Sequence, residues 1–196
     1  DSLEIVGQVQ PEKLSAMFQR YSDEGFRAVF ADVRGAFLRT IPVNESITPK
    51  LNVAALDDVR RILEGIDPIV VTDCICRKTK KILRRGCDGP METCFMFGSM
   101  ARYYLDNEMG RRVTAEEAFE IIRNAQKAGL VTQPSTSKNP NGLCNCCKDC
   151  CGVLSSMKSH PRPAEIVYSN HFSTVQAESC TGCGVCLSWC PMEAIV

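Results

Sequence analysis

Thirteen cysteines, all from residue 74 onward, restrict what this chain of 196 residues can fold into more than any other feature. A disulfide scaffold needs cysteines in pairs, but the count is odd, and the sequence contains the vicinal pairs Cys146-Cys147 and Cys150-Cys151. Ionised thiols packed this tightly repel one another unless a cation is shared between them. We therefore interpret the cysteines as reduced ligands that arrange the chain around metal.

The last of three cysteine groups has the most specific spacing. It forms a C-x2-C-x2-C-x3-C-P run made by Cys180, Cys183, Cys186 and Cys190. In such a run three cysteines hold one [4Fe-4S] cubane and the fourth holds a neighbouring cubane. Gly182 and Gly184 allow the backbone to turn around a cluster. We predict that this segment binds [4Fe-4S] and is half of a two-cluster unit.

The first group lies in DCICRKTKKILRRGCDGPMETC. Its candidate ligands are Cys74, Cys76, Cys87 and Cys94. The β-branched run 69–71 predicts a buried strand, and if it continues through Cys74 and Cys76, its period of two turns both sulfurs the same way. A loop can then return the other two thiols to a four-thiolate site. Four thiolates suit a cubane or a zinc ion, and this spacing does not choose between them.

The second group, LCNCCKDCCG, places five thiols within eight residues. They are Cys144, Cys146, Cys147, Cys150 and Cys151. Cys144, Cys147 and Cys150 repeat the C-x2-C-x2-C spacing, but Leu154 stands where a fourth cysteine would follow. Five thiols cannot all serve one cubane, so we predict a separate metal site, with a zinc knot or a redox-active thiol cluster as alternatives.

Basic residues crowd the loop of the first group. They are Arg77, Lys78, Lys80, Lys81, Arg84 and Arg85. We interpret them as a solvated helix face, or as cations that offset the negative charge of a thiolate-bound cluster or dock an acidic redox partner. Interleaved aromatic residues and a recognition motif are missing from the run, so the sequence gives no clear nucleic-acid site.

Hydrophobic periodicity predicts four helices. They cover 11–21, 52–64, 91–105 and the segment from the Thr114 capping box to Gly129. The first carries an apolar stripe that we expect to pack against a core or a partner, and the third places Cys94 in its first turn. The polar segment 133–142 is rich in turn residues and predicts a seam between two parts of the chain.

The 23 basic and 23 acidic side chains cancel, so the overall charge demands no nucleic-acid or membrane partner. No apolar run approaches the roughly 20 residues that span a bilayer, and no basic segment followed by an apolar one opens the chain. The sequence thus predicts a cytoplasmic protein without a membrane span.

The last 17 residues resemble the bacterial-type ferredoxin domain. The larger order of CICR, GCDGPMETC, GRRVTAEEAFEIIRNAQKAGLV, LCNCC and CTGCGVCLSWCP resembles iron-sulfur proteins of anaerobic bacteria and archaea over roughly residues 40–196. The resemblance implies a second C-x2-C-x2-C-x3-C-P motif downstream, so that Cys180, Cys183 and Cys186 share one cubane with a later cysteine and Cys190 reaches another. It also implies that the chain is a fragment truncated at both ends.

An internal pairing is the rival arrangement. In it, Cys144, Cys147 and Cys150 join Cys190 around one cluster, and either Cys146 or Cys151 completes the Cys180 triplet. In the favoured arrangement the LCNCC group is a metal site of its own, or one shared with the CICR group.

These observations predict an α+β chain in three parts. Residues 1–132 form a mainly helical body, 133–164 a cysteine-rich loop and linker, and 165–196 the first half of a ferredoxin-like unit. The predicted function is electron transfer through two or more [4Fe-4S] clusters in the complete protein, which makes the chain a carrier or an oxidoreductase subunit rather than an enzyme by itself. The alternative is a redox-sensing regulator or scaffold with structural zinc in the earlier groups.

Overall fold

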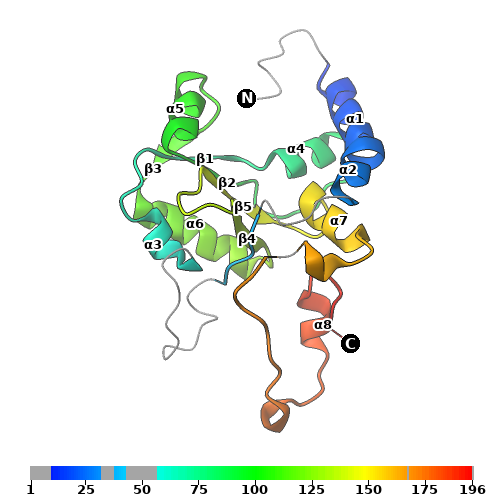
Figure 1. Ribbon diagram of the computed structural model, residues 1–196. Coiled ribbons are helices and arrows are strands. Elements are labelled where there is room, and N and C mark those ends of the chain that lie inside the picture. The colour runs from blue at the N-terminus through cyan, green and yellow to red at the C-terminus, as the bar shows by residue number, and fades with distance from the viewer. Residues whose placement is uncertain (1–9, 32–37, 43–56, 167, 196) are drawn as a thin grey trace.

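A computed structural model describes residues 10–31, 38–42, 57–166 and 168–195, and its centre is a five-stranded antiparallel sheet. The strands are β1 (Ile69–Asp73), β2 (Glu92–Phe97), β3 (Arg111–Val113), β4 (Val131–Pro134) and β5 (Gly142–Cys146), in the spatial order β3-β1-β2-β5-β4. Helices surround this sheet (Figure 1), which confirms the α+β class.

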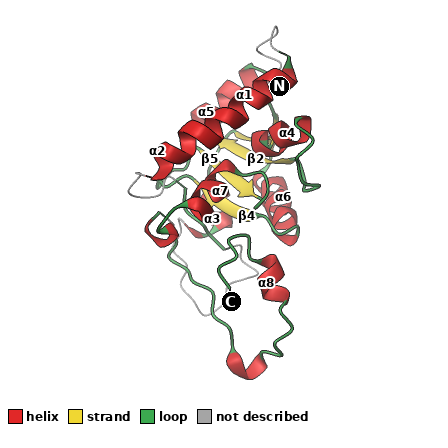
Figure 2. Cartoon of the chain, turned by 90° about the vertical axis from the view of Figure 1, so that its right-hand side faces the viewer, coloured by secondary structure: helices red, strands yellow, loops and turns green. Residues whose placement is uncertain are grey.

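Along the chain the helices occur before, between and after the strands, and Figure 2 shows them in red around the yellow strands. The α-helices are α1 (Pro11–Tyr21), α2 (Arg27–Ala31), α3 (Val59–Leu63), α4 (Ile75–Ile82), α5 (Gly98–Asp106), α6 (Ala115–Lys127), α7 (Gly152–Ser159) and α8 (Val185–Trp189). A π-helical turn, Ser22–Phe26, joins α1 to α2, and short 3-10 turns cover Pro163–Glu165 and Ala177–Ser179.

The main hydrophobic core lies between one face of the sheet and helices α3 and α6. Ile69 and Val71 of β1, Phe95 and Phe97 of β2 and Leu143 of β5 are buried in it. Side chains two residues apart in a strand share a face, so these five positions mark one side of the sheet. Burying them against α6 fixes which side every other strand residue takes.

Cysteines of β2 and β5 occupy the side of the sheet opposite the main core. Since β2 pairs antiparallel with β5 and Phe95 lies opposite Leu143, the neighbouring residues Cys94 and Cys144 are brought together. Cys146 lies two residues beyond Cys144 and shares its face. A second apolar cluster, which contains Cys146, Cys151 and Leu154, packs α7 over this side. The sheet therefore separates an apolar core from a layer of thiols.

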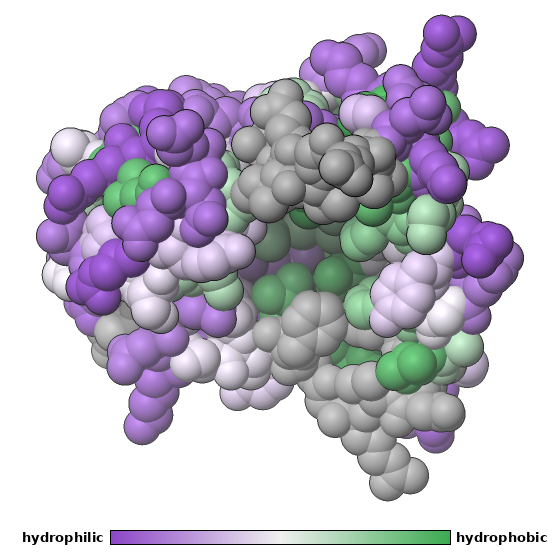
Figure 3. Space-filling model, turned by 90° about the horizontal axis from the view of Figure 1, so that it is seen from above, coloured by the Kyte–Doolittle hydropathy of each residue, from purple (hydrophilic) through white to green (hydrophobic). Residues whose placement is uncertain are grey.

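The surface carries its polar and apolar side chains in different places. Figure 3 shows hydrophilic side chains around the edges of the face seen from above, and hydrophobic ones in a hollow near its middle. Within the described residues, none of the helices combines the length and the apolar character needed to cross a membrane.

Some of the helices predicted from hydrophobic periodicity are present in the structure, and others differ from the prediction. The helices at Pro11–Tyr21 and after Thr114 are confirmed, and Val59–Leu63 confirms the described part of the helix predicted over 52–64. Residues 52–56 lie outside the described residues. The first helix does not bury its stripe in a core, because Met17 and Tyr21 are 55% and 61% exposed.

The helix predicted over 91–105 is wrong in its first half. Residues Glu92–Phe97 form β2, and the helix begins only at Gly98, whose φ of +56° favours glycine. The segment ETCFMF contains β-branched and aromatic residues that suit a strand between two others. Cys94 therefore projects from the middle of a sheet rather than from a helix turn.

The capping box of α6 gives a direct test of the fold. The Thr114 hydroxyl accepts a hydrogen bond from the Glu117 backbone N–H at 3.1 Å. Replacing Thr114 by Ala should lower the free energy of unfolding by about 1 kcal/mol, because that N–H loses its partner. Chemical denaturation measures the change, and Thr114→Ser, which keeps a hydroxyl, should stay close to the parent. Equal losses in both variants would contradict the assignment.

Candidate metal centre

Six thiols from four elements form a closed ring, which we call the six-thiol ring. Its members, in order around the ring, are Cys74, Cys94, Cys144, Cys146, Cys151 and Cys76, and each interacts with the two beside it. Four of these side chains are buried and two are half-buried. The ring joins the CICR pair at the start of α4, the middle of β2, the second half of β5 and the start of α7.

Two helices begin at the ring. Cys74 is the N-cap residue of α4, and Cys151 is the N-cap residue of α7. The unpaired N–H groups and the partial positive charge of a helix N-terminus favour an anion there. Both eight-residue helices therefore direct their positive ends toward the thiols, which suits a negatively charged centre.

The ring separates its thiols into two kinds. Hydrogen bonds from Cys146 and Cys94 hold the pKa of Cys144 well below its usual range. Hydrogen bonds from Cys146 and Cys76, together with those from backbone N–H groups at the start of α7, lower the pKa of Cys151 to about 4. The donor thiol of Cys76 has its pKa raised to about 11 by its interaction with Cys151. The ring thus favours negative charge on Cys144 and Cys151, and the pKa values of its other four thiols are raised.

A buried arginine lies among these sulfurs. Arg77 is 1% exposed; burial opposes its charge, but the nearby sulfurs of Cys74, Cys147 and Cys94 outweigh that effect and raise the pKa of the guanidinium. Its Nη1 donates to the Asn145 carbonyl oxygen at 3.1 Å, and its Nη2 donates to the Thr93 hydroxyl. The prediction that the whole basic run is a solvated face is therefore wrong for Arg77, which offsets thiolate charge from within.

Asn145 ties the strands of the ring together. Its side-chain amide donates to the Thr93 carbonyl oxygen at 2.9 Å, and its Oδ1 accepts from the Thr132 hydroxyl at 2.9 Å. Thr93, Thr132 and Asn145 belong to β2, β4 and β5, so one buried residue links three strands. The sequence shows Asn145 only as the polar residue between two cysteines, and this role was not predicted.

Three further thiols form a compact second group, which we call the thiol triad. Cys87 Sγ lies 3.7 Å from Cys147 Sγ and 3.7 Å from Cys150 Sγ. All three sulfurs lie within 4.8 Å of one another, and among the described residues this is the only set of three or more cysteine, histidine or carboxylate residues that meets this limit. Burial, together with the neighbouring sulfurs of Cys147 and Cys87, raises the pKa of Cys150 to about 12. The triad can hold a metal ion.

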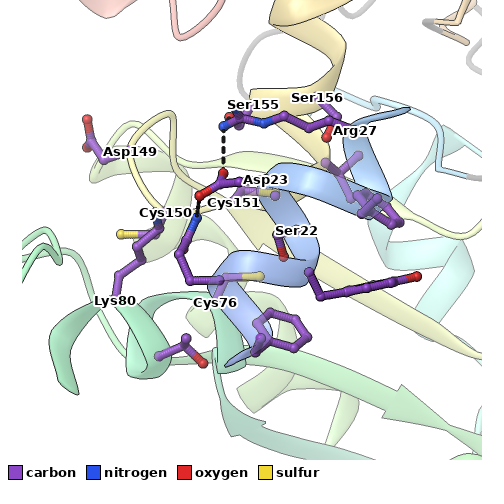
Figure 4. A pocket seen from close by; sticks show the side chains of 17 residues that line it. Ser22, Asp23, Arg27, Cys76, Lys80, Asp149, Cys150, Cys151, Ser155 and Ser156 are labelled. Atoms are coloured by element: carbon purple, nitrogen blue, oxygen red, sulfur yellow. Dashed lines mark hydrogen bonds and ion pairs between the residues drawn. The ribbon is translucent and has the colours of Figure 1, made fainter. Parts of the chain in front are cut away.

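Two cavities adjoin these groups. One, of about 290 Å³, is lined by Cys76, Cys150 and Cys151 on one side and by α1 and the turn that follows it on the other (Figure 4). The Arg27 guanidinium, which lies 2.9 Å from the Ser155 hydroxyl, ties the N-terminal helices to α7 at its rim. The second cavity, of about 380 Å³, lies beside Cys87 and Cys147 and is also lined by Trp189 and Pro191 of the C-terminal segment.

The C-terminal run lies at the surface. Cys180, Cys183 and Cys186 are exposed and Cys190 is half-buried. Gly182 and Gly184 have φ values of +69° and +73°, which other residues rarely adopt, and they turn the backbone around the thiols as the spacing predicts. The segment is held to the body by the ion pair of Lys158 with Glu193 at 2.6 Å and by Met192, which packs on the α7 cluster.

The cysteines thus assemble across the sequence groups rather than within them. Cys74, Cys76 and Cys94 meet three cysteines of the LCNCC group, whereas Cys87 meets the other two. The sequence predicts that the five thiols of LCNCCKDCC cannot all serve one cubane and that they form a site of their own or one shared with the CICR group. The structure divides them between two thiol groups, each of which includes cysteines of the first sequence group. The strand β1 ends at Asp73, and the CICR pair enters the ring from the first turn of α4 rather than from a continued strand.

Compared with protein-family models, curated proteins and solved structures, the chain shows no match in any of the three. The class of protein therefore follows from the site alone. The abundance of cysteines and the compact triad show a potential metal-binding protein and are compatible with iron-sulfur binding.

The Asn145 network leads to a prediction about the ring. Asn145→Ala should lower the free energy of unfolding by about 2 kcal/mol, because the buried Thr93 carbonyl and Thr132 hydroxyl lose their partners. Metal content should fall as well, since the strands that carry Cys94 and Cys144 lose their link. Denaturation and elemental analysis measure the two effects. The surface variant Asn139→Ala should change stability by less than about 0.5 kcal/mol; similar losses in both variants would refute the role of Asn145.

Proposed function

We propose that the chain is an iron-sulfur electron-transfer protein, or the redox subunit of a larger oxidoreductase, and that its cysteine thiolates bind [4Fe-4S] clusters. The six-thiol ring carries this proposal. It gathers more thiolates than a single zinc ion takes, next to a buried guanidinium and two helix N-termini.

The number of ring thiols supports a cluster over a single ion. No three of these sulfurs, all within the described residues, lie mutually within 4.8 Å, so they do not gather around one point as the ligands of one ion do. Six thiols also exceed the four that a single zinc ion takes, whereas a cubane spreads its thiolates over separate irons. Four ring members would hold one cubane, and the remaining two would stabilise its charge as hydrogen-bond donors.

The second proposed cluster is held by the C-terminal run. Cys180, Cys183 and Cys186 supply three thiolates, and Cys190 reaches toward a neighbouring cluster, as the C-x2-C-x2-C-x3-C-P spacing implies. A cubane whose irons are all bound by protein thiolates has no open position for substrate, so its function is to pass electrons. The contacts of Met192 and Glu193 with α7 bring this segment close to the body that carries the ring.

The surface for a redox partner follows from charge. Lys81, Arg84 and Arg85 are exposed at the end of α4 and in the turn after it. An acidic partner would be attracted to these cations. Arg77 takes no part in docking because it is buried.

Single replacements test the two clusters separately. In anaerobically prepared protein we expect iron and acid-labile sulfide, and we expect Cys183→Ala and Cys94→Ala each to remove one EPR signal of a reduced cluster, because the lost thiolate has no ready substitute. The double variant should lose both signals. Ser188→Ala, in helix α8 of the same C-terminal run, is the matched control and should keep both.

The same measurements separate the rival functions. Stoichiometric zinc without iron or sulfide would favour a redox-sensing scaffold and would end the electron-transfer proposal. An unchanged spectrum in Cys183→Ala would remove that residue from the ligand set.

Arg77 gives a prediction for the reduction potential of the ring cluster. Adding an electron makes the cluster more negative, and a nearby cation stabilises that state. Arg77→Gln should therefore make the potential more negative, whereas Arg85→Gln, which removes an exposed charge, should change it little because solvent screens that charge. Potentiometric EPR titration measures both. A shift toward positive values in Arg77→Gln would contradict the electrostatic role.

A further inference from the structure

The thiol triad differs from the six-thiol ring in the spacing of its sulfurs. A tetrahedral ion with metal-sulfur bonds of about 2.3 Å holds its sulfurs about 3.8 Å apart, because the edge of a tetrahedron is roughly 1.6 times the distance from its centre to a corner. The two separations from Cys87 Sγ, to Cys147 Sγ and to Cys150 Sγ, are each 3.7 Å. Three thiols placed this way match one ion.

Other uses of the three thiols fit less well. A disulfide would bring two sulfurs to about 2.05 Å. A cubane would bind each thiolate to a different iron and would separate them more widely than a single ion does. Cys87 Sγ lies equally far from the sulfurs of Cys147 and Cys150, so the geometry does not favour a disulfide of Cys87 with one of them over the other.

The local chain has the form of a zinc-binding turn. Cys147-Lys148-Asp149-Cys150 is a C-x2-C unit in a turn after β5, a ligand spacing typical of zinc sites. Cys87 comes from the loop after α4, where Gly89 passes its sulfur so closely that an added Cβ would lie 3.4 Å from Cys87 Sγ. Two separate loops thus converge on one point.

The fourth position of the tetrahedron has room for a ligand. The cavity of about 380 Å³ is lined by Cys87 and Cys147, and Lys127 and Lys148 also line it. Cys147 and Cys150 are buried, whereas Cys87 is half-buried, so access is from the side of Cys87. In zinc sites, three protein ligands with a fourth position left for water or substrate distinguish reactive centres from closed structural ones.

We propose that Cys87, Cys147 and Cys150 bind a single zinc ion whose fourth position takes a small anionic thiol from this cavity. Zinc prefers thiolate donors, and a carboxylate on the same small molecule would be attracted to the ammonium groups of Lys127 and Lys148. The site does not depend on the clusters proposed above, since it uses neither the ring nor the C-terminal run.

Zinc-edge X-ray absorption on the whole chain, prepared anaerobically with one equivalent of zinc, tests the proposal without interference from iron. We expect three sulfur neighbours at about 2.3 Å and one lighter neighbour from water. Adding 3-mercaptopropionate should replace the lighter neighbour by a fourth sulfur. Four sulfurs before the addition, or an unchanged spectrum after it, would overturn the open position.

Variants identify the ligands. Cys87→Ser should lower zinc affinity at least about tenfold in competition with a chelator. Loss of a residue that only orients a metal ligand already lowers metal affinity about tenfold or more, and loss of the ligand itself should lower it at least as much. Cys183→Ser and Asp149→Asn should keep the parent affinity. Full affinity in Cys87→Ser would overturn the site, and a loss in Asp149→Asn would show a closed site with a carboxylate as fourth ligand.

The two lysines are tested with a matched pair of thiols. Replacing both Lys127 and Lys148 by Ala should weaken 3-mercaptopropionate about fivefold and leave 2-mercaptoethanol, which lacks a carboxylate, unchanged. Equal effects on both thiols would overturn the selection for an anion.

Iron and sulfide are assayed separately from zinc. Zinc in a protein without iron would therefore support this site and would end the electron-transfer proposal.

Discussion

The burial of negative charge on sulfur is the constraint on which the structure depends. Six sulfurs meet on one face of the sheet because the antiparallel pairing of β2 with β5 brings Cys94 beside Cys144, and because α4 and α7 both begin there. Charge at this point is tolerable only with compensation. Arg77, the two helix N-termini and hydrogen-bonding thiols supply part of it, and a metal centre would supply the remainder.

Sulfur spacing divides the cysteines into two environments with different chemistry. No three sulfurs of the ring lie mutually within 4.8 Å among the described residues, whereas the three sulfurs of the triad do, and Cys87 and Cys147 of the triad border a cavity. On the proposals made above, the first environment stores and passes electrons, and the second presents a Lewis acid to a small molecule. Trp189 and Pro191 border the same cavity, so the C-terminal segment and the triad share one surface region.

Local patterns in the sequence were sufficient for some elements and not for others. Thr114 and Glu117 predict the start of α6 because the capping interaction involves only neighbouring residues. The β-branched run predicts β1. The strand at Glu92–Phe97 was missed because its apolar residues continue directly into those of α5, and only its partners on both sides decide its conformation. The sequence predicts the cysteines as metal ligands, but their grouping depends on strand register. Nothing in the basic run distinguishes Arg77, which tertiary packing alone buries.

Adjacent cysteines belong to different centres. Cys146 and Cys151 contribute to the ring, and Cys147 and Cys150, each one residue away, contribute to the triad. The short turn between β5 and α7 is therefore anchored at four points by two groups of sulfur. Filling one centre fixes the backbone that the other requires, so the entropy of ordering that turn is lost only once. When both metals are supplied, filling one centre is therefore expected to favour filling of the other, although the triad can take zinc by itself.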